Sequence, residues 1–146
     1  MFQVLGAIGL LVSSATIGMD KASVEVTAIA ASGEKKDGAI ETDEGCKKFA
    51  DNFKAFKYAV YKTIGARTLE LGEKKSETCE FGSYRVRVTL KEIVGDKIKI
   101  GLVFYKGKEE VGKQTVTISP GGKPQFTEIG EENNKATLFA LSAAGK

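Results

Sequence analysis

The sequence predicts a mainly β domain of the α+β class: an antiparallel β-sandwich or partly open barrel, with one amphipathic helix packed on the sheet. Two observations predict this fold. Apolar and polar residues alternate with a period of two through much of the second half of the chain, as they do in strands with one buried face. A single stretch, about residues 43–58, repeats its apolar residues at helical spacing instead. Strands of this kind with one helix are the elements of a two-layer fold.

The alternation is clearest over residues 84–118, which we expect to form a three-stranded antiparallel meander. Residues 84–91 alternate first, and the pattern restarts over 98–104 after Gly95-Asp96. Glycine accepts the positive φ that a tight primed hairpin turn needs at its first central position. A second break at 106–108 leads into the run that ends at Ile118.

Within this meander, Gly107 and Gly112-Lys113 have the glycine spacing of a phosphate-binding P-loop. The next position holds Gln114 rather than Ser or Thr, and the residues that follow alternate as a strand instead of opening a helix. We therefore predict a charged hairpin turn with a glycine bulge, and no nucleotide binding.

Further strands are expected on both sides of the meander, and together they make one domain over residues 21–146. They cover residues 24–32, 58–71, 78–81, 126–129 and 136–143. We expect the first and last of them to complete the sandwich or barrel.

The expected helix, about residues 43–58, begins at Thr42 or Asp43, either of which can cap its first turn. Its apolar stripe consists of Cys46, Phe49, Phe53, Phe56 and Val60. Such a stripe is how a lone helix docks on a sheet, and burying one phenylalanine contributes about 1.5 to 3 kcal/mol. We expect this helix to cover an edge or an end of the sheet.

Residues 1–20 form an apolar leader with no charged side chain before Asp20. Its small residues are typical of a secretory signal cleaved after Ala15 or Gly18, but the basic residues that begin such signals are missing. The segment is a signal peptide, an uncleaved anchor or an apolar assembly arm, or the true start lies upstream. We expect an exported protein, located in the periplasm, on the cell surface or outside the cell. Membrane contact is expected only through residues 1–19, if the leader is retained.

The chain has two cysteines, Cys46 and Cys79. In an exported protein, an even number of cysteines at such separation suggests one disulfide, here joining the helix to the sheet. A bridge of this kind would stabilise the fold by about 3 to 4 kcal/mol. The alternative is two unrelated buried thiols.

The composition argues against several functions. Histidine is absent, which removes the usual general base, the Ser-His and Cys-His pairs and the His ligands of most catalytic zinc sites. The formal charge of +3 is too small to indicate a nucleic-acid partner. We therefore expect neither an enzyme nor a cofactor, metal or nucleic-acid site.

These observations favour an exported, non-catalytic envelope or surface protein that binds another macromolecule or assembles with itself, because strand edges are ready templates for pairing. The alternative is a carrier of a small apolar ligand, with a pocket between sheet and helix. That pocket would be lined by Phe49, Phe53, Phe56, Leu102 and Phe104. A hydrolase that uses carboxylates or lysine ranks last.

Overall fold

The computed structural model describes residues 21–35 and 39–143. The expected leader, residues 1–20, lies outside the described residues, and so does the end of the expected domain, residues 144–146. No helix in the described part is long and apolar enough to cross a membrane.

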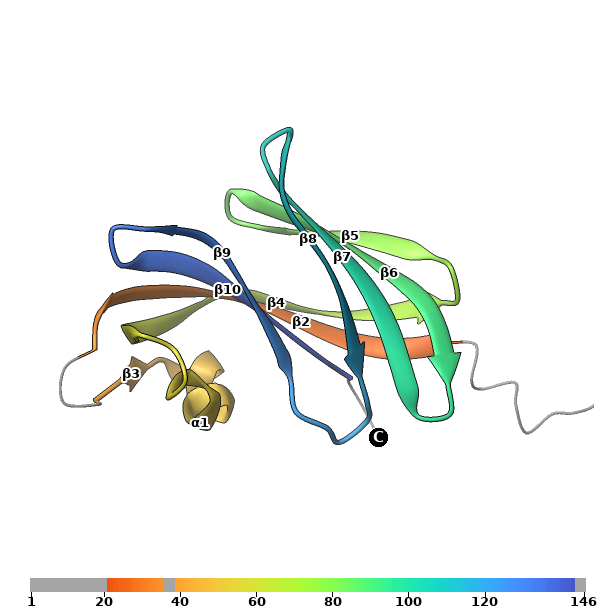
Figure 1. Cartoon of the computed structure of the whole chain (residues 1–146), viewed down its shortest axis with the longest axis horizontal. Helices are drawn as coiled ribbons and strands as arrows, with labels where there is room; N and C mark the ends of the chain where they lie inside the picture. Colours follow the sequence, from red (N-terminus) through yellow and green to blue (C-terminus); the bar gives the residue numbers. More distant parts are fainter. Residues whose placement is uncertain (1–20, 36–38, 144–146) are drawn as a thin grey trace, which may run out of the picture.

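The described chain folds into two packed β-sheets and a short helical segment (Figure 1). One sheet has the strand order β3-β4-β2-β10-β9 and the other the order β5-β6-β7-β8. The predicted mainly β, sandwich-like fold is confirmed, and the two sheets are not closed into a barrel. The strands are β2 (Lys21–Glu34), β3 (Glu41–Thr42), β4 (Tyr58–Gly72), β5 (Ser76–Phe81), β6 (Tyr84–Val94), β7 (Lys97–Lys106), β8 (Glu109–Ile118), β9 (Gln125–Glu132) and β10 (Lys135–Ala143).

The long strands follow one another in an up-and-down order. Each strand from β5 to β8 is antiparallel to the next, β9 pairs with β10, and β10 returns to pair with β2, from Lys135 opposite Ser32 to Ala143 opposite Val24. The sheets meet where β4 lies beside β5 and where β8 lies beside β9. The start of β2 therefore lies at the same end as the β4–β5, β6–β7 and β8–β9 turns (Figure 1).

The five-stranded sheet is covered on both faces, so the described part of the protein has two cores. One face, with Val26 and Phe139, packs against the four-stranded sheet. The other face, with Ile29 and Leu138, packs against the helical segment. Neighbouring residues of a strand point to opposite faces, which explains why residues 138–141 of β10 are buried without a break.

The helical segment is shorter than the helix expected over about residues 43–58. A 3-10 helix, η2 (Glu44–Phe49), leads into one α-helical turn, α1 (Ala50–Phe53). Val60 lies in β4, where it pairs with Ser32. The helical spacing at its C-terminal end is overridden because these residues take part in the ladder with β2. The segment also covers a face of the five-stranded sheet rather than an edge or an end (Figure 1).

The hairpin turns of the meander agree with the sequence. Gly95 has a φ of +63° in the turn that joins β6 to β7. Gly107, with a φ of +66°, begins the turn between β7 and β8, and the register shifts beside Gly112. The bulged hairpin predicted in place of a P-loop is therefore confirmed.

The predicted Cys46–Cys79 disulfide is wrong: both cysteines are free and buried. Cys46 lies in the core beneath the helical segment and Cys79 in the core between the sheets, so the five-stranded sheet separates them. An even number of cysteines says nothing about the short distance that a disulfide requires. The structure matches the alternative of two unrelated buried thiols.

Candidate functional site

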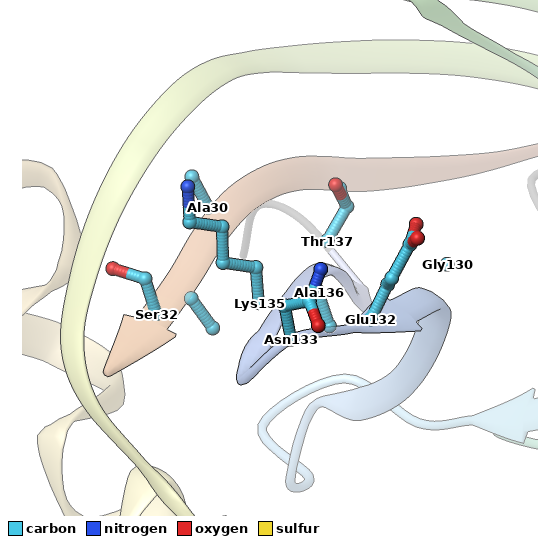
Figure 2. Close-up of a pocket in the computed structure, with 9 residues that line it drawn as sticks. Ala30, Ser32, Gly130, Glu132, Asn133, Lys135, Ala136 and Thr137 are labelled. Carbon is cyan, nitrogen blue, oxygen red and sulfur yellow. The ribbon is translucent and has the colours of Figure 1, made fainter. Parts of the chain in front are cut away.

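A groove of about 560 Å³ opens at the end of the five-stranded sheet that bears the β9–β10 turn (Figure 2). We call it the hairpin groove. It is lined by Ala30, Ala31 and Ser32 of β2 and by Gly130, Glu132, Asn133, Lys135, Ala136 and Thr137 of the β9–β10 hairpin.

The strand register places four of these side chains on one face of the sheet. Ser32 lies opposite Lys135, and Ala30 lies opposite Thr137. Directly paired residues of antiparallel strands share a face, and two residues further along β10 the same face carries Phe139 in the core. The groove therefore continues a buried sheet face. It is lined by small and polar side chains at the end where the four-stranded sheet diverges from the five-stranded sheet (Figure 1).

Lys135 and Glu132 are the charged residues that line the groove. They lie opposite each other at the end of the hairpin, but Figure 2 shows Lys135 extending toward β2 while Glu132 stands on the other side of the groove. Both are exposed, and neither forms an ion pair within the described ranges. Both charges are thus open to contact from outside.

The backbone around the groove is held in place at two points. Asn133 and Asn134 both adopt left-handed conformations, with φ of +54° and +58°, as in a two-residue type I′ turn. The carbonyl of Asn134 accepts a 2.9 Å hydrogen bond from the amide of Gly33. This bond ties the hairpin to the end of β2, so the groove has a fixed rim.

A second polar cluster, Asp43 with Cys46 and Thr63, fastens the helical segment to β4. The Asp43 carboxylate accepts hydrogen bonds from the Cys46 amide (3.1 Å), the Thr63 amide (2.8 Å) and the Thr63 hydroxyl (3.0 Å). These bonds, that from the Thr63 amide foremost, lower the pKa of Asp43. Burial raises the pKa of Cys46 to about 11. A thiol protonated at neutral pH is a poor nucleophile, and the cluster works as a helix cap.

An aromatic cluster fills the space between the helical segment and the sheet. Phe53 stacks on Tyr61 with ring centroids 3.9 Å apart, and Phe126 lies edge-on to Phe53 at 6.1 Å. The hydroxyl of Tyr58 donates to Glu128 at 2.5 Å. Burial raises the pKa of Tyr58 and of Tyr61 to about 12, so both phenols stay neutral.

The structure does not bring together the five residues expected to line an apolar ligand pocket. Phe49, Phe53 and Phe56 belong to the aromatic cluster beneath the helical segment, whereas Leu102 and Phe104 lie in the core between the sheets. The five-stranded sheet stands between the two groups, because it is covered on both faces. The lining predicted for a carrier is therefore not assembled.

Sequence reasoning missed the hairpin groove. A usable signal was the run of small residues at 30–32, which ends an alternating strand without a large apolar side chain. The second signal was Asn133-Asn134, a pair typical of primed hairpin turns. Within the described residues, no group of three or more potential metal ligands comes together.

The fold and groove define a two-sheet, sandwich-like domain with an open polar groove at one end. Comparison of the chain with protein-family models, curated proteins and solved structures found no match. Functional inference therefore rests on the residues of the chain itself.

Proposed function

We propose that this protein is an exported, non-catalytic envelope or surface protein that assembles with copies of itself through the hairpin groove. Export is supported by the apolar residues 1–19 of the sequence. The free thiols of Cys46 and Cys79 do not support export, because a disulfide between them would have been a second indication of an oxidising compartment.

The observation that carries self-assembly is the pair of opposite, unpaired charges in the groove. Lys135 and Glu132 lie on one exposed surface, and each lacks an ion-pair partner among the described residues. In a two-fold symmetric dimer the same patch meets itself, so residue i of one copy contacts residue j of the other and the reverse. Each Lys135 can then meet the Glu132 of the second copy, which pairs both charges at once.

Neighbouring groups in the groove favour the same arrangement. The hydroxyls of Ser32 and Thr137 and the amide of Asn133 line it with the charged pair. They can donate and accept hydrogen bonds, and the rigid rim reduces the entropy lost on association. A polar, preorganised patch of this kind suits a protein surface better than a small apolar ligand.

A charge-swap series on the full chain tests the proposal. Lys135→Glu and Glu132→Lys, each made singly, bring like charges together in the dimer and should shift the protein to the monomer in size-exclusion chromatography with light scattering. The double variant restores opposite charges and should restore assembly. Lys108→Glu, in the β7–β8 turn outside the groove, is the matched control and should change nothing.

Two results would count against groove-mediated assembly. One is a wild-type chain that is monomeric at the concentrations tested. The other is a set of single variants that assemble as well as the wild type, which would place the association elsewhere, including on residues 1–20.

A further inference from the structure

Lysines gather at the end of the molecule where β2 begins. We call this region the basic end and define it as Lys21 together with the turn segments 73–75, 92–99 and 119–124, which the up-and-down topology brings to one side (Figure 1). The amide of Lys74 donates to the carbonyl of Leu90, and the amide of Leu90 donates to the carbonyl of Lys75. These bonds tie the first segment to β6, just before the second segment begins. Its lysines are Lys21, Lys74, Lys75, Lys97, Lys99 and Lys123, and its carboxylates are Glu73, Glu92 and Asp96.

The positive charge of the chain is concentrated here. Six lysines against three carboxylates leave an excess of +3, which equals the formal net charge of the whole chain. All six lysines are exposed. The four ion pairs found among the described residues use other lysines: Lys47, Lys48, Lys54 and Lys57. The charge of the basic end is therefore neither balanced by the rest of the surface nor tied up in ion pairs.

An apolar side chain stands among these charges. Val94 is 63% exposed, more than any other large hydrophobic residue in the described part of the chain. It precedes Gly95 in the tight turn between β6 and β7, and Lys97 follows that turn. A protruding apolar residue beside lysines can enter a membrane interface while the lysines meet lipid headgroups, as the two faces of an interfacial amphipathic helix do.

We propose that the basic end docks on the surface of an anionic phospholipid bilayer, with Val94 entering the interface. The proposal concerns a surface at the opposite end of β2 from the hairpin groove, and it does not depend on self-assembly. The excess positive charge complements an anionic lipid surface. Moreover, residues 1–19 carry no charged side chain, and we expect them to contact membrane if retained. They are followed by Asp20 and then by Lys21, which lies in the basic end.

Vesicle co-sedimentation of the full chain tests this docking. One set of vesicles is phosphatidylcholine alone, and the other contains about one part phosphatidylglycerol in four. Because residues 1–19 carry no charged side chain, they should bind both sets about equally, and the ratio of the two partition coefficients then reports the contribution of the basic end. We expect that ratio to exceed tenfold in about 0.1 M salt and to approach one in about 1 M salt, where charges are screened within about 3 Å.

A four-lysine variant with a matched control locates the effect. Substituting Lys74, Lys75, Lys97 and Lys99 with glutamine leaves two lysines against three carboxylates in the basic end. The ratio should therefore fall to about one, because no excess positive charge remains to attract anionic lipid. The control substitutes four exposed lysines near the other end and outside the hairpin-groove charge pair, Lys57, Lys62, Lys106 and Lys108, and should leave the ratio unchanged. Val94→Ser should weaken binding to both kinds of vesicle.

The proposal is overturned if the wild-type chain does not prefer the anionic vesicles, or if both four-lysine variants lose the preference equally. It is also overturned if anionic vesicles fail to bind while single-stranded DNA or an acidic polysaccharide does. Far-UV circular dichroism of each variant confirms that the comparison is made between folded proteins.

Discussion

Replacing Phe139 with alanine should remove a large part of the stability of the protein. Phe139 is 2% exposed and lies in the core between the sheets. Its ring centroid is 4.9 Å from that of Phe104, 5.8 Å from that of Tyr84 and 6.2 Å from that of Phe81. One side chain thus joins β10 to strands β5, β6 and β7.

The magnitude follows from this burial. A Phe→Ala substitution in a core costs about 3 to 5 kcal/mol, and aromatic pairs of this geometry contribute about 0.5 to 1.5 kcal/mol beyond their buried area. We therefore expect a loss near the upper limit, about 4 to 5 kcal/mol. Since a domain has a total unfolding free energy of about 5 to 15 kcal/mol, the variant should remain barely folded or unfold at room temperature.

Urea unfolding followed by far-UV circular dichroism measures the loss. Leu138→Ala serves as the companion, because Leu138 is fully buried in the other core and should cost about 2 to 5 kcal/mol. Thr117→Ala, at an exposed position of β8, should change stability by at most about 0.5 kcal/mol. A loss below about 1 kcal/mol for Phe139→Ala would refute the packing argument, and a neutral Leu138→Ala would show that only one face of the sheet is buried.

Three further predictions concern the helix cap, the thiols and a glycine. Asp43→Ala should lower the unfolding free energy by about 1 kcal/mol at neutral pH. Because the folded pKa of Asp43 lies below its ordinary value of 3.8, this stabilisation is present above that value and is lost as the pH falls through the folded pKa. Urea unfolding of the wild type and the variant should therefore give converging stabilities in acid. The two buried cysteine thiols should react with a thiol reagent only after unfolding, and reductant should leave the unfolding midpoint unchanged; a midpoint lowered by reductant would indicate a disulfide. Gly130→Ala should cost about 2 to 3 kcal/mol and Gly95→Ala only about 1 to 2 kcal/mol. Both glycines have positive φ, but only at Gly130 would a Cβ meet the Tyr84 hydroxyl, at 2.5 Å. Equal losses of stability in thermal unfolding would exclude the packing part of this argument.

The strands could be predicted from the sequence because each has a local signal. A period of two marks the buried face of the meander, and Gly95 marks its first turn through the positive φ that the turn requires. The helix was placed correctly at its start, since Asp43 caps it, but its length was overestimated. The spacing from Phe53 to Val60 is helical, yet α1 ends at Phe53 and strand pairing with β2 determines the conformation from Tyr58 onward.

The candidate site and the cysteine pairing depend on distances that no local pattern encodes. Cys46 and Cys79 lie on opposite sides of the five-stranded sheet because that sheet is covered on both faces. Lys135 and Glu132 become one open patch only because the four-stranded sheet diverges before the end of the β9–β10 hairpin. In the sequence they are ordinary polar residues near a turn.

Strands β2 and β10 belong to both cores, and this determines how the protein unfolds. Each supplies one wall to the core between the sheets and, with its alternate residues, one wall to the core beneath the helical segment. Neither half can melt while the other stays intact, because losing either strand opens both. Heating should therefore give one calorimetric peak, and no fragment that lacks β2 or β10 should fold stably.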